Sequence, residues 1–498
     1  MLKKIRIILA VVMFIAVSLL FLDFTGTASR ILGWTARIQF LPAILSLNVG
    51  VVLALILLTL LAGRVYCSVI CPMGVFQDIV SWINTRRKKK NKFRFGWQPE
   101  LKWLRYGVLV VFIVALIAGV GSFVALLAPY SSWGRIVSNL FQPLWRLGNN
   151  LLASIAAHYD SYAFYSTDVW IKSIPTFAIA VATFLIIGWL AWRGGRTYCN
   201  TVCPVGTVLG FLSRFSIFRP VIQKEKCVEC GLCAKSCKAS CIDAQNHKID
   251  YSRCVACMDC LENCTHDAIR FTSRLKSRPV QLAKPSADTV DSSRRDFLVI
   301  GGVMALAATA NAQKKVDGGL AEIEDKKVPE RASRIVPAGA ISQRNFAQHC
   351  TACQLCVSEC PNDVLRPSSD ILTLMQPEMS YERGYCRPEC TRCSTVCPAG
   401  AILPVSREEK SAIHIGHAVW VRANCIPLTD GVECGNCARH CPVGAIQMVP
   451  SDPGDGTSLK IPVVNEERCI GCGACENLCP ARPFSAIYVE GYEVHNED

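Results

Sequence analysis

The 498-residue sequence predicts a multi-domain chain in which an α-helical, polytopic membrane domain is followed by small α+β modules built around cysteines. Two observations predict this fold class. The first 195 residues contain four long apolar runs but only two of the 29 cysteines, and the remaining 303 residues contain the other 27. The hydrophobic content is 51% and is concentrated in those runs, which indicates a membrane rather than one large globular core.

The four apolar runs are each about long enough to cross roughly 30 Å of bilayer hydrocarbon. They cover residues 5–22, 41–61, 106–128 and 174–191. The first run could be a cleaved signal peptide, but because three further runs follow it we expect it to be an anchor in membrane lipid. None of the four contains histidine, so no haem held by two helix histidines is expected, and no Cys-x-x-Cys-His motif for covalent haem occurs.

The net charge of +14 is explained by topology and does not call for a nucleic-acid partner. Residues 62–105 contain ten Lys or Arg, whereas residues 23–40 contain two and residues 129–173 contain three. Positively charged loops stay in the cytoplasm, so this pattern places the N-terminus inside and returns the chain inside after the fourth run.

The membrane domain contains an internal repeat of twelve residues. Residues 63–74 and 195–206 are identical at seven positions, lie 132 residues apart and each contain Cys-x-x-x-Cys-Pro. The repeat predicts a duplicated two-helix hairpin, with each pair of sulfurs on one face of a helix that the proline ends. The thiols of Cys67, Cys71, Cys199 and Cys203 are candidates for three roles: small buried groups, redox-active pairs, or ligands of a metal or cluster that both pairs share.

A second pattern begins after Pro220, where two runs of cysteines have the spacing C-x2-C-x2-C-x3-C. This spacing is typical of bacterial ferredoxins with two [4Fe–4S] clusters, in which the fourth cysteine of each run serves the other cluster. Zinc would fit two pairs but not a third evenly spaced cysteine. We therefore expect one cluster on Cys227, Cys230, Cys233 and Cys264, and another on Cys254, Cys257, Cys260 and Cys237.

This region departs from the usual ferredoxin pattern at three positions. Lys238 and Thr265 stand where proline usually follows the last cysteine of each run. Cys241 is a fifth cysteine, which could replace Cys237 as a ligand but which we expect to fill a small core position.

An export signal is predicted in the middle of the chain. Residues 293–298 form a twin-arginine motif, a mildly apolar run follows, and Ala310-Asn311-Ala312 matches a cleavage site. The twin-arginine translocase moves folded proteins, as a domain whose clusters are inserted in the cytoplasm requires. The sequence leaves open whether the segment is cleaved or remains as a fifth span.

Four further cysteine groups follow, each ending in Cys-Pro, and they predict four more [4Fe–4S] clusters, six in all. The repeated spacing argues against a disulfide framework even in an oxidising compartment. The second and third groups are enlarged in their first gap. The groups are Cys350, Cys353, Cys356 and Cys360; Cys386, Cys390, Cys393 and Cys397; Cys425, Cys434, Cys437 and Cys441; and Cys469, Cys472, Cys475 and Cys479.

These motifs resemble two known families. Residues 1–270 resemble the NapH-type membrane component of periplasmic nitrate reductase systems, and residues 290–498 resemble its NapG- or MauM-type exported ferredoxin partner, so the chain resembles a fusion of the two. By analogy with related four-cluster subunits, the resemblance implies that the first group pairs with the fourth and the second with the third. The implied sets are Cys350, Cys353, Cys356 with Cys479; Cys469, Cys472, Cys475 with Cys360; Cys386, Cys390, Cys393 with Cys441; and Cys425, Cys434, Cys437 with Cys397.

The resemblance also implies a function, which is oxidation of quinol from the quinone pool and delivery of electrons to a periplasmic reductase or cytochrome. The chain is then an electron-transfer subunit with quinol dehydrogenase activity. Two alternatives are electron supply for metal-centre or thiol assembly, and flow from ferredoxin to quinone. No G-x-G-x-x-G or P-loop occurs, so no NAD(P)H or ATP site is expected. The outer loop with Trp133, Trp145, His158, Tyr159 and Asp160 is a candidate quinol neighbourhood, or a set of interfacial aromatic anchors.

The expected organisation is a multi-pass protein of the bacterial inner membrane with a cytoplasmic and a periplasmic ferredoxin-like module. The expected domains are a four-helix membrane domain (1–215), a cytoplasmic two-cluster domain (216–272), a linker (273–292), the twin-arginine segment (293–312), a linker (313–340) and an exported four-cluster domain (341–498). About 30 Å of membrane without a predicted cofactor separates the two modules, which is too far for a single electron hop.

Overall fold

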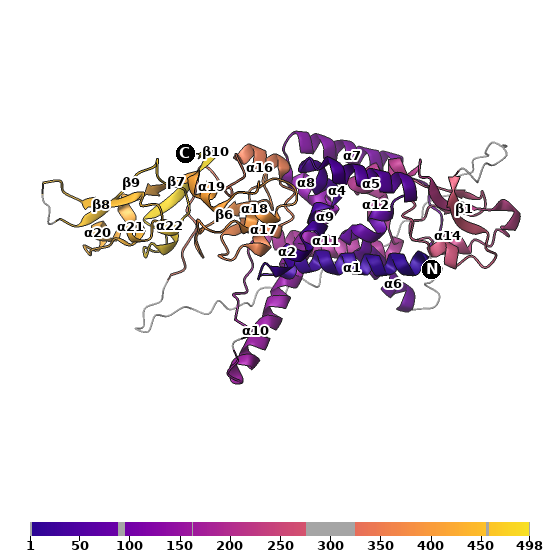
Figure 1. The fold of residues 1–498 in the computed structure, drawn as a ribbon, viewed down its shortest axis with the longest axis horizontal. Coiled ribbons are helices and arrows are strands. Elements are labelled where there is room, and N and C mark those ends of the chain that lie inside the picture. Colours follow the sequence, from indigo (N-terminus) through magenta and orange to yellow (C-terminus); the bar gives the residue numbers. More distant parts are fainter. Residues whose placement is uncertain (1, 88–94, 162, 275–323, 455–457, 498) are drawn as a thin grey trace, which may run out of the picture.

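The computed structural model describes residues 2–87, 95–161, 163–274, 324–454 and 458–497. The predicted export signal at 293–312 lies outside the described residues, as does most of the basic run at 86–94. The described chain forms a central bundle of helices with one small helix-and-strand module at each end (Figure 1). We call residues 216–274 module 1 and residues 324–497 module 2.

Two helices of the bundle are long and apolar enough to cross a membrane, judged by length and composition over the described residues. They are α1 (Leu2–Leu22) and α11 (Ile174–Gly194), with mean hydropathies of 2.9 and 2.1. Each has 21 residues and is therefore about 31 Å long at 1.5 Å per residue. They correspond to the first and fourth predicted apolar runs.

The second and third predicted runs are each interrupted, so the expectation of four continuous spans is not met. The second run forms α4 (Phe40–Leu45) and α5 (Val49–Ala62), and the side chain of Asn48 between them caps α5 by accepting a hydrogen bond from Val51 N at 3.2 Å. The third forms α7 (Lys102–Ile117) and α8 (Gly121–Leu127), separated at Gly119, whose φ is +75°. A helix cap and a left-handed residue end the helices inside otherwise apolar sequence.

The two Cys-x-x-x-Cys-Pro motifs form turns between helices rather than the ends of regular helices. In the first, Cys67 lies in a π-helical turn (Tyr66–Ile70), Cys71 is extended with ψ 114°, and Pro72 begins α6 (Pro72–Arg87). In the second, Cys199 lies in α12 (Thr197–Thr201), Cys203 is extended with ψ 117°, and Pro204 begins α13 (Pro204–Ser213). The proline therefore starts the following helix, and its ring excludes the helical conformation from the cysteine before it.

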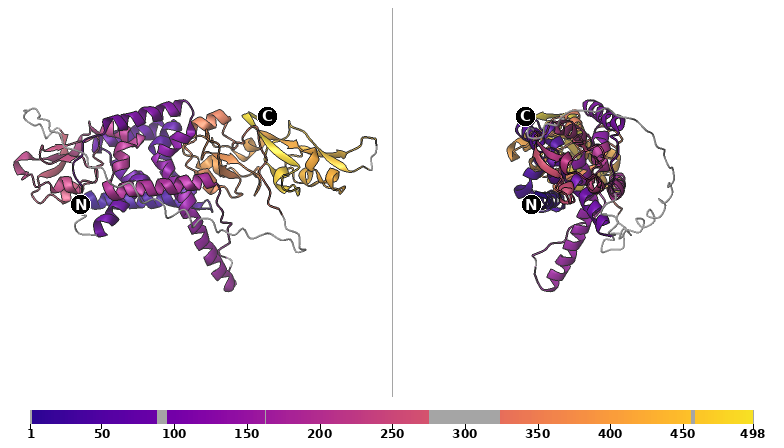
Figure 2. Two further views of the ribbon diagram at one scale, coloured as in Figure 1. Left: turned by 180° about the vertical axis from the view of Figure 1, so that it is seen from behind. Right: turned by 90° about the vertical axis from the view of Figure 1, so that its right-hand side faces the viewer.

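A helical segment between α8 and α11 lies partly at the end of the bundle that faces module 2. It comprises α9 (Pro129–Ile136), a π-helical turn (Val137–Phe141) and α10 (Gln142–His158), and α10 projects away from the body (Figures 1 and 2). Helix α9 is wholly buried. Shorter helices α2 (Thr27–Leu32) and α3 (Trp34–Arg37) follow α1.

Both modules consist of short antiparallel strand pairs and one-turn helices. In module 1, β1 (Phe218–Ile222) pairs with β4 (Ile269–Ser273) and β2 (Ile242–Asp243) with β3 (Lys248–Ile249), beside α14 (Leu232–Ser236) and α15 (Asp259–Glu262). Module 2 contains three such pairs: β5 (Leu365–Pro367) with β6 (Pro377–Met379), β7 (Ile413–Trp420) with β10 (Ile487–Glu497), and β8 (Ile446–Pro450) with β9 (Lys460–Val464). Its cysteines lie on or next to α17 (Leu355–Glu359), α18 (Arg392–Val396), α21 (Asn436–Arg439) and α22 (Ala474–Leu478).

Helix α1 connects the two modules in space. Near its N-terminus, Lys3 forms an ion pair with Asp259 of module 1 at 3.0 Å. Near its other end, α1 contacts α17 of module 2. The modules therefore lie at opposite ends of the bundle, separated by about the length of one 21-residue helix (Figure 1).

Candidate metal centres

The cysteines of module 1 gather into the two sets that the sequence predicted. One cavity is lined by Cys227, Cys230, Cys233 and Cys264, and the other by Cys237, Cys241, Cys254, Cys257 and Cys260. Cys241, which we expected to fill a core position, is buried but also lines the second of these cavities, and its sulfur lies 3.6 Å from that of Cys237.

A left-handed residue directs the chain around the cavity in each group with the regular spacing. It stands between the second and third cysteines and precedes a one-turn helix, so the loop reverses and brings three thiols to one side. The two enlarged groups have other conformations at this place, with φ −113° at Thr391 and −146° at Gly435. The spacing of the cysteines and the backbone conformation before the one-turn helix therefore change together. The left-handed residues at this place are Gly231, Met258, Gln354 and Gly473, and each of these groups has another between its first and second cysteines, which is Glu229, Ala256, Ala352 or Gly471.

The sixteen cysteines of module 2 also form four sets, but their pairing differs from the one that the resemblance implied. Cys360 lies with the second group, Cys397 with the first, Cys441 with the fourth and Cys479 with the third. The sets are Cys350, Cys353, Cys356 and Cys397; Cys386, Cys390, Cys393 and Cys360; Cys469, Cys472, Cys475 and Cys441; and Cys425, Cys434, Cys437 and Cys479.

The physical reason for this pairing is local packing. Helix α17 of the first group packs on α18 of the second, and α21 of the third packs on α22 of the fourth. Groups that are neighbours in the chain therefore exchange their fourth cysteines, as in module 1. Module 2 is two such two-site units in succession, and the pairings of the first group with the fourth and of the second with the third are wrong.

Two lysines of module 2, the buried Lys410 and the half-buried Lys326, approach the cysteine sets and were not predicted from the sequence. Lys410 Nζ lies 3.2 Å from Cys386 Sγ and donates to the carbonyl oxygens of Arg387 and Cys390. Lys326 Nζ donates to three carbonyl oxygens at the fourth group, and one of these is the carbonyl oxygen of Cys479 at 3.0 Å. The motif Ser406-x-x-Glu409 forms a capping box on the helix of Lys410 and was a usable signal for that helix.

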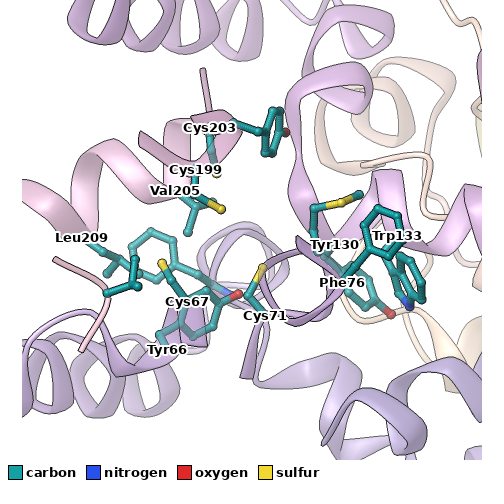
Figure 3. Packing of buried hydrophobic residues seen from close by; sticks show 14 of the residues in the cluster. Tyr66, Cys67, Cys71, Phe76, Tyr130, Trp133, Cys199, Cys203, Val205 and Leu209 are labelled. Carbon is teal, nitrogen blue, oxygen red and sulfur yellow. The ribbon is translucent and has the colours of Figure 1, made fainter. Parts of the chain in front are cut away.

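The four cysteines of the two membrane-domain motifs meet in the middle of the bundle, and we call them the four-thiol centre. Cys67, Cys71, Cys199 and Cys203 are each at most 4% exposed, and their sulfur atoms point toward one another (Figure 3). They belong to one apolar cluster with Tyr66, Tyr198 and Leu209. The structure thus brings together residues that are 132 positions apart.

Two fully buried arginines exchange hydrogen bonds between the motif copies. Arg64 of the first copy donates from Nη2 to the carbonyl oxygen of Cys199 at 3.1 Å, and Arg196 of the second donates from Nη1 to that of Cys67 at 2.7 Å. Each guanidinium also lies near a thiol, Arg64 at 3.8 Å from Cys67 Sγ and Arg196 at 4.0 Å from Cys199 Sγ. The arginines stand in the repeated motif, but sequence reasoning assigned them no role.

The same arginines reach module 1. Arg64 Nη1 donates to Ser252 O at 3.1 Å, two residues before Cys254, and the backbone N–H of Arg196 donates to Lys238 O at 2.8 Å, one residue after Cys237. Gly195, with φ +68°, permits this approach, because a Cβ there would lie 2.5 Å from Lys238 O. The four-thiol centre is therefore adjacent to the cysteine set of Cys237 and Cys254.

A buried ion network explains the unusual Lys238. Asp78 accepts from Arg196 at 2.8 Å, Arg6 at 3.0 Å and Lys238 at 3.1 Å, and Lys238 also pairs with Asp259 at 3.1 Å. Burial alone would raise the pKa of Asp78, but Arg196 and Lys238 outweigh it and hold that pKa well below its ordinary value. Lys238 therefore docks module 1 onto the bundle, which a proline at this position could not do.

Helix α9 lies between the four-thiol centre and module 2. Gly134 packs directly on the carbonyl of Cys353, since a Cβ there would lie 2.5 Å from that oxygen. Arg135 Nη1 donates to Ala352 O at 3.5 Å, and Asn139 donates to the side chain of Gln354 at 2.9 Å. The loop that carries Cys350, Cys353 and Cys356 is thus held against the bundle.

The residues proposed as a quinol neighbourhood are not brought together. Trp133 is buried in the bundle and donates to Ser18 Oγ at 3.1 Å. Trp145 and Tyr159 are exposed, and His158 at the end of α10 is 13 residues, about 20 Å of helix, from Trp145.

Three family models match parts of the chain. One described as a 4Fe-4S binding domain matches residues 46–91 and 174–224, which include the four-thiol centre and none of the module 1 cysteines. Two described as 4Fe-4S dicluster domains match residues 250–364 and 432–482. No solved structure matches the chain.

Several curated proteins are similar to this chain. The methylamine utilization ferredoxin-type protein MauM of Methylophilus methylotrophus is 32% identical over 164 residues, which is 31% of this chain and 70% of that protein. MauM of Methylorubrum extorquens is 30% identical over 207 residues, 40% of this chain and 87% of that protein. The ferredoxin-type protein NapH of Escherichia coli is 26% identical over 246 residues, 48% of this chain and 71% of NapH.

Proposed function

Because the chain belongs to the family of ferredoxin-type proteins that includes MauM, and is an iron–sulfur electron-transfer protein, we propose that it oxidises quinol and passes electrons to a reductase or cytochrome on the exported side of a membrane. The observation that carries the proposal is the placement of two cysteine-rich modules at opposite ends of one apolar bundle, with four buried thiols between them. Quinol oxidation releases two electrons and two protons, and the oxidised exported acceptor takes up the electrons.

The proposed topology is a fusion of a NapH-type membrane part with a MauM-type exported part. Four apolar segments cross the membrane as a duplicated hairpin, module 1 faces the cytoplasm, and the twin-arginine segment exports module 2. Three features support this arrangement: the length of α1, close to the roughly 30 Å of bilayer hydrocarbon; the Lys3–Asp259 ion pair at one end of it; and the contact with α17 at the other.

The six cysteine sets of the modules suit [4Fe–4S] clusters, which would carry one electron at a time. The chain's own residues prepare these sites for negative charge. Backbone N–H groups donate to Cys264 Sγ, Cys441 Sγ and Cys479 Sγ at 3.2–3.3 Å, and Lys410 adds a cation at Cys386. Hydrogen bonds and positive charge of this kind raise the affinity of a site for an electron.

A role in metal-centre or thiol assembly is less well supported by the site. In that role the motif thiols would act on an external metal or disulfide, and so would need access to it. Each of the four thiols is at most 4% exposed. Reversed flow, from cytoplasmic ferredoxin to quinone, uses the same path and becomes an outcome of the test.

The test uses the full-length chain, purified anaerobically in detergent and oxidised. A reduced menaquinol analogue is added, and cluster reduction is followed by EPR and visible absorption. We expect reduction of the module 2 sites. Reduction by dithionite but not by quinol would contradict the proposal, and quinone reduction by the dithionite-reduced protein would then identify reversed flow.

A further inference from the structure

We propose that the four-thiol centre binds a seventh [4Fe–4S] cluster, which links the two modules through the membrane domain. The first argument is the ligand set. Four thiols converge from two motif copies, and all are buried in one apolar cluster (Figure 3). Four cysteines without histidine or carboxylate are the usual ligands of an iron–sulfur cluster.

The four-thiol centre resembles the six cysteine sets of the modules in one respect. Among the described residues, no group of three or more His, Cys, Asp or Glu side chains is close enough to hold one metal ion. This holds for the four-thiol centre and equally for the six sets in the modules, where each sulfur is expected to bind a different iron of a cubane. The centre therefore has the same all-cysteine ligand set as the module sites, for which clusters are proposed.

Hydrogen bonds to the sulfurs repeat the pattern of the module sites. The backbone N–H of Gly206 donates to Cys203 Sγ at 3.3 Å, much as that of Ala268 donates to Cys264 Sγ. The side chain of Gln77 donates to Cys199 Sγ at 3.1 Å. Donors aimed at sulfur stabilise thiolates that bind metal.

The charge of the surroundings calls for an anion. Arg64 and Arg196 are both fully buried, and Arg64 makes no ion pair with a carboxylate in the part of the chain that the structure describes. A buried cation without a partner is costly. A [4Fe–4S] cluster with four thiolates is a dianion when oxidised, so it would supply the counter-charge that Arg64 lacks, while Arg196 keeps its ion pair with Asp78.

The position of the centre closes the gap left by the sequence. On one side Arg64 and Arg196 contact the backbone beside Cys254 and Cys237. On the other, α9 packs on the loop of Cys353. The role as an electron link rests on the proposed function, whereas binding of the cluster does not.

The test is the iron and sulfide content of the full-length protein, purified anaerobically and checked by Mössbauer spectroscopy. We expect about 28 iron per chain, against about 24 for six cubanes. The double variant Cys67→Ala/Cys199→Ala should lose about four iron and four sulfide. The control Ser68→Ala, which changes a buried side chain between the two thiols of the first motif, should keep all of them.

A second variant guards against general unfolding. Cys71→Ser leaves three thiolates, so the oxidised protein should show a [3Fe–4S] EPR signal while the module clusters remain. Equal iron contents near 24 in the wild type and the double variant would overturn the proposal, as would about one zinc or copper per chain at the centre, or a loss of only two iron. If iron is near 28 but quinol reduces no cluster, the seventh cluster is supported and the proposed function fails. If iron is near 24 and quinol reduces the module 2 sites, the proposed function is supported and the seventh cluster is not.

Discussion

The two copies of the membrane-domain motif form the same contacts with each other but have different electrostatic surroundings. Arg64 and Arg196 each bond the carbonyl of the first cysteine in the other copy. Arg196, however, forms an ion pair with Asp78, whereas the residue at the corresponding position of the second repeat, 132 positions on, is Gly210. A duplicated motif thus specifies a symmetric interlock, and residues outside the motif decide its charge balance.

Gly210 has no side chain because Arg105 and the carbonyl of Ser252 occupy the space that a side chain there would need. A Cβ at Gly210 would lie 2.0 Å from Arg105 Nη2 and 2.5 Å from Ser252 O. Arg105 is neutralised by Glu100 at 2.8 Å and shares the carbonyl of Ser252 with Arg64. One half of the repeat therefore binds the N-terminal helix and Lys238 through Asp78, and the other half binds α7 and module 1 through Arg105.

Removing the carboxylate that distinguishes the halves should have the largest effect. Asp78→Asn leaves Arg6, Arg196 and Lys238 without their shared anion in a buried place. We expect a loss of about 3–5 kcal/mol of stability, measured by thermal or denaturant unfolding in detergent. Glu467→Gln, at an exposed carboxylate, is the control and should change stability little. A neutral result for Asp78→Asn would mean that the network does not hold module 1 on the bundle.

Substitutions at Gly74 and Gly206, which lie at equivalent contacts between the two motif copies, should reduce stability equally. A Cβ at Gly74 would lie 2.1 Å from Cys67 O and 2.6 Å from Arg196 Nη1, and one at Gly206 would lie 2.4 Å from Cys199 O and 2.8 Å from Arg64 Nη2. Each Gly→Ala change should cost about 1–3 kcal/mol by overpacking, as measured by the same unfolding assay. Gly148→Ala on α10 meets nothing within 4 Å and should instead be neutral or slightly stabilising. Unequal losses would argue against the interlock.

Replacing each arginine in turn tests the difference in charge between the surroundings of Arg64 and those of Arg196. Arg64→Gln and Arg196→Gln each remove a cation beside the four thiols, and loss of positive charge disfavours the reduced state of a bound cluster. We expect both to lower the reduction potential of the centre in an EPR-monitored titration. Arg64→Gln should lower it more, because Asp78 already offsets the charge of Arg196. Arg→Lys variants, which keep the charge, should recover most of the potential.

The smallest expected effect is a pH dependence of stability that comes from His495 in module 2. Burial lowers the pKa of His495 to about 4, and neither ring nitrogen has a hydrogen-bond partner in the described part of the chain. The folded state thus disfavours the protonated ring, so stability is lost as the pH falls below the unfolded value of about 6.5 and continues to fall toward 4. We expect about 1 kcal/mol lost at pH 5.5, and less in His495→Phe; identical pH profiles of the two proteins would contradict this.

Local spacing made the module sites predictable, and distance along the chain limited the rest. In four of the six groups, three cysteines lie within seven residues and form a loop of their own, so these groups and the module 1 pairing could be read directly. The fourth ligands of module 2 depend on how α17, α18, α21 and α22 pack, and a family analogy gave the wrong pairs. The two broken spans were hidden because a cap at Asn48 and a left-handed Gly119 hardly alter the hydropathy of the run.

The sequence by itself determined the apolar runs, the twelve-residue repeat and the cysteine groups, because each depends on residues close together in the chain. Only the tertiary structure decided that the two thiol pairs form one centre, that Arg64 and Arg196 cross between the copies, and that Lys238 binds Asp78. These contacts join residues more than 100 positions apart, and hydrophobic burial, which is non-directional, does not specify them. They arise when the helices pack and buried charges must find partners.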